Sequence, residues 1–197
     1  MTAHRAFIFD LDGTLLDSEV LWVQAADACL RDHDRALPYH EVLDIVYGRS
    51  WYDIFPMLQA RLGGDLPLPR QAMEDDLARR VHEFRATQDI RIPGSVTLLK
   101  RLARTYPVCI VSGAPRREVE DAVHLMNIAP NVEFWLGAED YSPGKPDPTC
   151  FLMAAARLDV PPAACVVFED SRAGVTAAKA AGMFCVALTR DGAPAQD

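Results

Sequence analysis

Two aspartates stand two residues apart near the start of the chain, in Asp10-Leu11-Asp12-Gly13-Thr14. The apolar residues 6–9 before them predict a buried strand, where a charge without a partner is costly. Ligands of open α/β sheets bind outside the carboxyl ends of the strands. The pair therefore indicates a metal site or an attacking group, and a plain turn around Asp-Gly is the alternative.

A serine and a lysine follow later apolar runs. Ser112 ends the run 107–112, and Gly113 after it lets the backbone approach a ligand closely. A helix start follows, so free N–H groups and the Ser112 hydroxyl favour an anion site, although a helix-capping serine also fits. Lys145 lies in Gly-Lys-Pro-Asp-Pro, where Pro146 favours an extended lysine. Its ammonium would offset charge on a phosphoryl group, and a solvated surface lysine is the alternative.

A second pair of acids repeats the first pattern. Glu169 and Asp170 stand where the apolar run 164–169 ends. Together with Asp10 and Asp12, these carboxylates supply the hard oxygen ligands that Mg²⁺ prefers, while capping of the following helix is the alternative. If the strands run parallel, the two acid pairs, the serine and the lysine all meet at one edge of the sheet.

The elements that must position these residues alternate between two patterns. Short apolar runs predict strands at residues 5–10, 107–112, 132–137, 164–169 and 183–188. Helical patterns occupy residues 95–105, 115–127, 148–158 and 172–181. This alternation predicts the α/β class, with a parallel sheet and helices on both faces. Pro115 and Pro148 suit first helical turns, and Gly182 suits the position just past a helix end.

Residues 19–88 differ from the rest of the chain in their pattern of predicted secondary structure. Helical patterns lie near 19–33, 39–47, 50–62 and 69–87, and no convincing strand interrupts them. A helical block of this length after the first strand predicts an inserted subdomain. We expect a core domain of residues 1–16 and 91–197, and an inserted helical domain of residues 17–90.

Composition excludes several classes of function. The 197 residues are half apolar and carry a formal net charge of −8, and no stretch concentrates Lys and Arg, so nucleic acid and anionic membranes are poor partners. No apolar run approaches the ~20 residues of a membrane span, and no signal peptide precedes Asp10. We therefore expect a cytoplasmic protein, as a monomer or weak dimer. The cysteines lack metal-binding spacing and fit small buried hydrophobes: Cys29, Cys109, Cys150, Cys165 and Cys185.

Taken together, four motifs in this order resemble the haloacid dehalogenase-like (HAD) superfamily of phosphohydrolases. They are residues 10–14, Ser112, Lys145 within Gly-Lys-Pro-Asp-Pro, and Glu169-Asp170. The helical insertion is similar to the cap of the branch that contains β-phosphoglucomutase and phosphoglycolate phosphatase. The resemblance covers essentially the whole chain. It implies a Rossmann-like core with a central first strand and a mobile helical lid.

The resemblance also implies a role for each motif residue. Asp10 would attack phosphorus and form an aspartyl-phosphate, and Asp12 would protonate the leaving alcohol and then activate water. Mg²⁺ would be held by the Asp10 side chain, the Asp12 main-chain carbonyl and Asp170, with Glu169 acting through water. Ser112, Gly113 and Lys145 would bind the transferred phosphoryl group.

Differences from the patterns of individual branches of the family reduce the number of activities that the sequence favours. An acid at Asp12 argues for phosphoryl transfer, because true dehalogenases lack one there. Residues 19–88 contain no lysine, which argues against a phosphonate hydrolase with a Schiff base. Trp22 and Trp51 stand where β-phosphoglucomutase has a His and an Arg, so the pattern favours a phosphatase over a mutase.

The expected activity is therefore a Mg²⁺-dependent phosphatase that acts on small phosphorylated metabolites such as sugar phosphates. A β-phosphoglucomutase-like hexose-phosphate mutase is the alternative. A receiver-like phospho-accepting domain is disfavoured, since its acceptor ends the third strand and no helical insertion follows its first. Arg49, in a loop between helices, and Trp22 are the candidates for substrate specificity, although such aromatic residues also suit the core of the inserted domain.

Overall fold

The chain divides into two compact units. The computed structural model describes residues 4–49 and 51–189. Within them, residues 4–17 and 91–189 form the first unit, and residues 18–90 form the second. All of the motif residues at predicted strand ends belong to the first unit.

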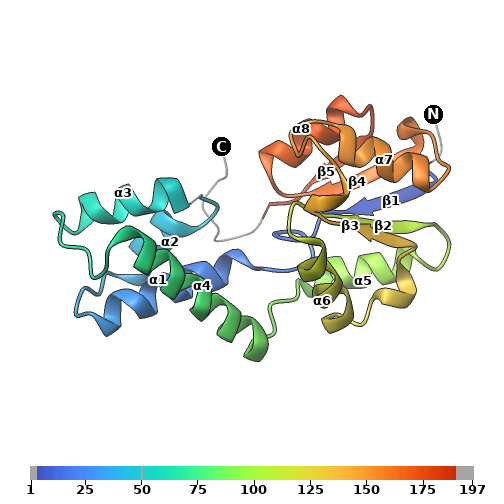
Figure 1. The fold of residues 1–197 in the computed structure, drawn as a ribbon. Coiled ribbons are helices and arrows are strands. Elements are labelled where there is room, and N and C mark those ends of the chain that lie inside the picture. The colour runs from blue at the N-terminus through green and yellow to red at the C-terminus, as the bar shows by residue number, and fades with distance from the viewer. Residues whose placement is uncertain (1–3, 50, 190–197) are drawn as a thin grey trace. The chain divides into compact units, whose positions relative to one another are not determined.

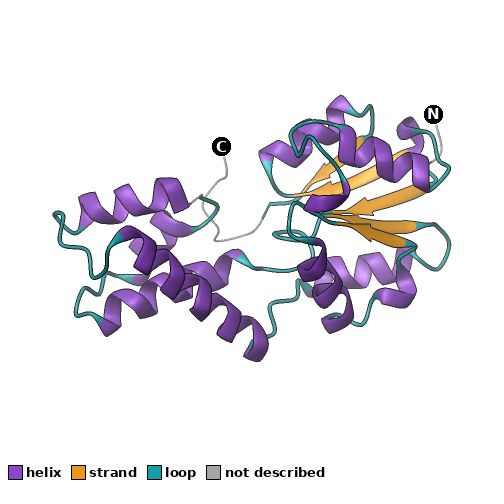
Figure 2. Ribbon diagram, viewed as in Figure 1, coloured by secondary structure: helices purple, strands orange, loops and turns teal. Residues whose placement is uncertain are grey.

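The first unit is built on a parallel sheet of five strands (Figure 2). The strands are β1 (Ala6–Phe9), β2 (Val108–Val111), β3 (Phe134–Leu136), β4 (Cys165–Glu169) and β5 (Phe184–Ala187). Their order is β3-β2-β1-β4-β5, so the first strand is central and is paired with β2 and β4. The predicted strands, their parallel pairing and the α/β class are confirmed.

Helices cover both faces of this sheet. They are α5 (Pro93–Leu102), α6 (Arg116–Leu125), α7 (Thr149–Arg157) and α8 (Arg172–Ala180), with short 3₁₀ turns η1 (Ala129–Asn131), η2 (Ala138–Asp140) and η3 (Pro162–Ala164). Helices α7 and α8 lie on one face, and α5 and α6 on the other (Figure 1). Side chains alternate between faces along each strand, so Ile8, Cys109 and Val167 share one apolar cluster with α7 and α8.

The second unit is all-helical in the residues that the structure describes. Its helices are α1 (Glu19–Asp32), α2 (Tyr39–Val46), α3 (Trp51–Arg61) and α4 (Arg70–Thr87). Buried side chains such as Leu30 of α1 and Leu77 of α4 form its own hydrophobic core. An ion pair also joins α1 to α4, between Asp32 and Arg80 at 2.8 Å. Because this core is separate from the sheet, the unit has a packing basis of its own.

Three details refine the expectations from sequence. Pro115 and Pro148 lie at the residue before α6 and α7, one position earlier than predicted, whereas Pro93 takes the first helical position of α5. Pro115 has an extended ψ of 139°, so the helix begins only after it. Cys185 is half-buried on the edge strand, while the other cysteines are buried as expected.

None of the helices in the described ranges is both long and apolar enough to cross a bilayer.

Gly182 provides a test of the helix end after α8. Its φ of +74° lies in the left-handed region, which costs an alanine about 1 kcal/mol. Gly182→Ala should therefore lower the midpoint of thermal unfolding, by about 2–4 °C. Gly94, in the first turn of α5, is the matched control, because a Cβ there meets nothing within 4 Å. Gly94→Ala should raise stability by about 0.5–1 kcal/mol. Equal losses of stability in the two variants, measured by calorimetry, would contradict this expectation.

Candidate active site

The register of the sheet brings the ends of three strands to one level. Phe9 of β1 is paired with Ile110 of β2 and with Phe168 of β4. The next residue on each strand is therefore Asp10, Val111 and Glu169. Because these residues are level, one side chain placed above the edge can contact all three.

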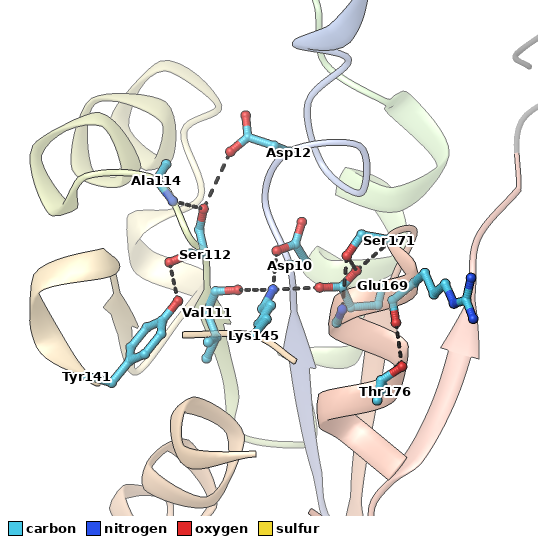
Figure 3. Close-up of polar contacts among 12 residues, drawn as sticks. Asp10, Asp12, Val111, Ser112, Ala114, Tyr141, Lys145, Glu169, Ser171 and Thr176 are labelled. Atoms are coloured by element: carbon cyan, nitrogen blue, oxygen red, sulfur yellow. Dashed lines mark hydrogen bonds and ion pairs between the residues drawn. The ribbon is translucent and has the colours of Figure 1, made fainter. Parts of the chain in front are cut away.

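Lys145 is that side chain. Its Nζ lies 2.5 Å from Asp10 Oδ1 and 2.6 Å from Glu169 Oε1, and it donates to the Val111 carbonyl oxygen at 3.3 Å (Figure 3). The lysine side chain is only 10% exposed, so the predicted stiff segment delivers it into the protein rather than to solvent. The alternative of a solvated surface lysine is wrong.

The charges in this cluster shift one another's pKa values. Burial raises the pKa of Asp10 well above its usual range, because it disfavours the carboxylate, and this outweighs the lowering by Lys145. Burial alone would lower the pKa of Lys145, but Asp10 and Glu169 together raise it. The ammonium therefore keeps its proton. Any further positive charge near Asp10 would favour its ionised form.

Glu169 is held tightly by its own loop. It is fully buried, and its Oε2 accepts hydrogen bonds from the Ser171 N–H at 2.8 Å and the Ser171 hydroxyl at 2.9 Å. Ser171 also caps α8 by accepting from the Gly174 N–H at 3.0 Å. A Cβ on Gly174 would lie 1.7 Å from Glu169 Oε1, so this position requires glycine. Both oxygens of Glu169 already have partners, one of them Lys145.

Asp10, Glu169 and Asp170 form an acidic cluster that fits a divalent cation. One carboxylate oxygen from each lies within 4.8 Å of the other two. Gly13 has a φ of +82°, and a Cβ there would lie 1.8 Å from Asp170 Oδ2, so only glycine lets that carboxylate approach the Asp10–Asp12 loop. Three carboxylates beside one ammonium leave negative charge that a hard cation would offset.

The Asp12 side chain faces a different partner. Ser112 Oγ donates to Asp12 Oδ2 at 3.4 Å and accepts from the Ala114 N–H at 3.0 Å (Figure 3). Asp12 is partly exposed and Gly113 is exposed, whereas Ser112 is 1% exposed. The two aspartates of the opening motif thus have separate surroundings, one with the buried ammonium and one with the hydroxyl. Such a separation is what an acid and a base of different function need.

The start of α6 differs from the expectation of free N–H groups. Ser112 does not cap this helix, since the N-cap position is Pro115. The first helical N–H, that of Arg116, donates to Glu139 Oε2 at 2.7 Å, so a carboxylate of the protein already occupies that donor. The Ala114 N–H already donates to Ser112 Oγ, so the candidate donors for an anion at this edge are the Ser112 hydroxyl and the Gly113 N–H.

The two specificity candidates lie in the second unit. Arg49 is exposed and its guanidinium donates to the carbonyl oxygen of Asp44. Trp22 is partly buried and packs against the core of that unit. Neither residue belongs to the unit that holds the Lys145 cluster, and their contribution to substrate recognition stays a prediction.

Two residues of the site were not predicted from the sequence. The sequence does contain an indication of Gly174, because a glycine in the first turn of a helix is unfavourable unless a local contact requires it. This helix follows a strand that ends in acids, so a close contact with one of those acids could have been predicted. The sequence around Tyr141 contains no such indication, since a tyrosine between η2 and a proline-rich segment matches no functional pattern. Its hydroxyl nevertheless donates to the Ser112 carbonyl oxygen at 2.8 Å.

Comparisons with known proteins place this arrangement in a family. A family model described as haloacid dehalogenase-like hydrolase matches residues 4–182. The chain is 33% identical over 192 residues to validoxylamine A 7'-phosphate phosphatase of Streptomyces hygroscopicus subsp. limoneus, covering 94% of this chain and 86% of that protein. It is 32% identical over 191 residues to hexitol phosphatase A of Escherichia coli K12, covering 93% and 82%.

A solved structure supports the same assignment. The crystal structure of a putative β-phosphoglucomutase from Thermotoga maritima superposes with a TM-score of 0.77 at 25% identity, covering 95% of this chain and 88% of that one. The likeness therefore extends over both units and not over the sheet alone. The predicted resemblance and the prediction of an enzyme are confirmed. The chain belongs to the haloacid dehalogenase-like hydrolases.

Proposed function

We propose that this protein is a Mg²⁺-dependent phosphatase that hydrolyses small phosphorylated metabolites through an aspartyl-phosphate. One observation carries the proposal: the Asp10 carboxylate is 2.5 Å from the buried Lys145 ammonium, while Asp12 is hydrogen-bonded to Ser112 at the same sheet edge. A carboxylate can attack a phosphate dianion only where their repulsion is offset. Lys145 supplies part of that positive charge.

In the first step, a carboxylate oxygen of Asp10 attacks phosphorus and the bond from phosphorus to the ester oxygen breaks. The leaving alcohol takes a proton from the Asp12 carboxyl group. Lys145 and the Ser112–Gly113 turn bind the phosphoryl oxygens, so the developing charge meets donors that are already in place. The product is an acyl phosphate on Asp10 and a neutral alcohol.

In the second step, Asp12 removes a proton from a water molecule, and that water attacks phosphorus. The bond from phosphorus to Asp10 breaks, which releases inorganic phosphate and restores the carboxylate. Asp12 ends the cycle protonated, as it began. The mechanism requires Asp12 to carry a proton that Asp10 lacks, and the two side chains have separate partners, Ser112 for Asp12 and Lys145 for Asp10.

The acidic cluster supports the cofactor part of the proposal. Asp10, the main-chain carbonyl of Asp12 and Asp170 would hold Mg²⁺, with Glu169 engaged through water or through Lys145. When bound, the ion supplies positive charge that offsets the repulsion between phosphate and carboxylate. The hard oxygen donors fit Mg²⁺ better than a soft thiophilic metal.

The substrate is proposed from the relatives and from the second unit. Two phosphatases of more than 30% identity act, by their names, on validoxylamine A 7'-phosphate and on a hexitol phosphate, which favours a phosphorylated sugar or similar alcohol here. Arg49 and Trp22 are proposed to contribute to its recognition. The likeness to a putative β-phosphoglucomutase keeps a hexose-phosphate mutase as the second candidate. Conversion of a 1-phosphosugar to its 6-phosphate, without free phosphate, would favour the mutase.

Asp10→Asn tests the nucleophile. An amide cannot form the acyl phosphate, so release of p-nitrophenol from p-nitrophenyl phosphate should fall by at least about a thousandfold. Asp159→Asn is the matched control, because Asp159 is exposed with a φ of +54° that asparagine tolerates. That variant should retain wild-type turnover. Substantial turnover by the Asp10 variant would refute the covalent mechanism.

Asp12→Ala tests the division between the two steps. The p-nitrophenolate leaving group needs little protonation, so the first step should survive, whereas activation of water should not. Rapid mixing should give a burst of about one p-nitrophenolate per protein, followed by turnover at least about a hundredfold slower than wild type. Loss of both the burst and the turnover would show that Asp12 is needed for the first step with this substrate.

Removal of the metal tests the acidic cluster. Dialysis against a chelator should abolish turnover, and added Mg²⁺ should restore it. Asp170→Asn should raise the Mg²⁺ concentration for half-maximal activity by at least about tenfold, because a ligand is weakened, while Asp159→Asn should not. Full activity of the chelated protein would contradict the metal requirement.

A further inference from the structure

Tyr141 is buried beside the candidate active site, yet the proposed mechanism does not use it. The residue follows η2, is 8% exposed and belongs to the apolar cluster that α7 and α8 form with the sheet. Its hydroxyl donates to the main-chain carbonyl oxygen of Ser112 at 2.8 Å (Figure 3). A buried hydroxyl is unfavourable without such a partner. The contact therefore fixes the tyrosine as well as the serine.

The Ser112 carbonyl needs this donor because the β-ladder has ended. The last pair between β2 and β3 is Val111 with Leu136. The Ser112 N–H still donates to the Leu136 carbonyl oxygen at 3.0 Å. The N–H of Ala138, which would reach the Ser112 carbonyl in a continued parallel ladder, donates instead to the Ala114 carbonyl oxygen at 2.9 Å. The Tyr141 hydroxyl thus takes the place of a strand partner, at the residue where the chain leaves the sheet and enters the turn.

The same segment of chain serves the neighbouring carbonyl. Val111 accepts from Lys145 Nζ at 3.3 Å, and Ser112 accepts from the hydroxyl of Tyr141. Two successive carbonyls at the end of β2 therefore receive donors from residues four apart in the 141–145 segment. The placement of the ammonium and the placement of the turn are fixed by one piece of backbone.

We propose that Tyr141 is a positioning residue for phosphoryl binding, which holds the Ser112 main chain so that the Ser112 hydroxyl and the Gly113 N–H face the phosphoryl group. The inference rests on the proposed function and adds to it a residue that touches neither substrate nor metal. Burial raises the pKa of Tyr141 to about 12, so its hydroxyl keeps its proton and donates throughout the neutral range.

Tyr141→Phe removes the donor and keeps the ring in the core. Because the turn loses its anchor, the KM for p-nitrophenyl phosphate and the Ki for inorganic phosphate should each rise about five- to tenfold. The value of kcat should stay within about twofold, and the Mg²⁺ activation constant should not change, since Asp10 and Asp170 are untouched. A purely structural role would lower the unfolding midpoint without this selective loss of phosphate affinity.

Tyr106→Phe is the matched control. Tyr106 precedes β2 at the opposite end of the strand, is 39% exposed, and packs its ring on Phe7 at a centroid distance of 5.2 Å. The substitution removes one hydroxyl from the same unit but far along the strand from Ser112. We expect all of the kinetic constants to match wild type.

A double-mutant cycle with Ser112→Ala tests whether Tyr141 acts through the serine. If it does, the double variant should lose less phosphate affinity than the product of the two single losses, because the second change removes an interaction already impaired. Losses that multiply would overturn the proposal, as would a phosphate Ki for Tyr141→Phe equal to that of wild type. If the wild-type protein neither hydrolyses the ester nor binds phosphate, the proposed function fails, and the inference falls with it.

Discussion

The structure of the candidate site depends on one buried ammonium shared between two carboxylates. Lys145 lies within 2.6 Å of both Asp10 and Glu169, and all three side chains are removed from solvent. Charges in such a place are tolerated only as a set, because removing one partner from a buried pair costs about 3–5 kcal/mol. The sheet meets this requirement through its register, which puts the two acids level on adjacent strands. Neither strand could slip by one residue without breaking the cluster.

The surrounding loops preserve this arrangement. Glu169 can accept from Ser171 and approach α8 because Gly174 has no side chain. Asp170 can approach the first loop because Gly13 has none. Both glycines are thus placed where a carboxylate needs room rather than where the chain needs flexibility alone. Glu169, at the end of β4, is therefore oriented by its own loop before any ligand arrives.

Much of this was predictable from the sequence, for reasons that are local. Apolar runs that end in Asp10, Ser112 and Glu169 mark buried parallel strands, and the parallel arrangement alone brings their ends together. What could not be predicted depends on contacts between distant segments. The pattern gives no sign that Glu139 would take the Arg116 N–H, or that Tyr141 would find the Ser112 carbonyl. Such partners are chosen by tertiary packing.

Asp10 and Asp12 have different surroundings, although they are only two residues apart, because the strand ends just before Asp10. Along a regular strand, two side chains at positions i and i+2 would lie on the same face and share one environment. Here β1 ends at Phe9, and the chain turns through Leu11 so that Asp10 stays with Lys145 while Asp12 faces Ser112. The proposed mechanism needs an ionised nucleophile and a protonated acid, and the two carboxyl groups proposed for these roles stand close together in different surroundings. The end of β2 matters for the same reason, since the segment that carries Lys145 to Asp10 also carries Tyr141 to Ser112. A single stretch of backbone thus sets the environment of both aspartates.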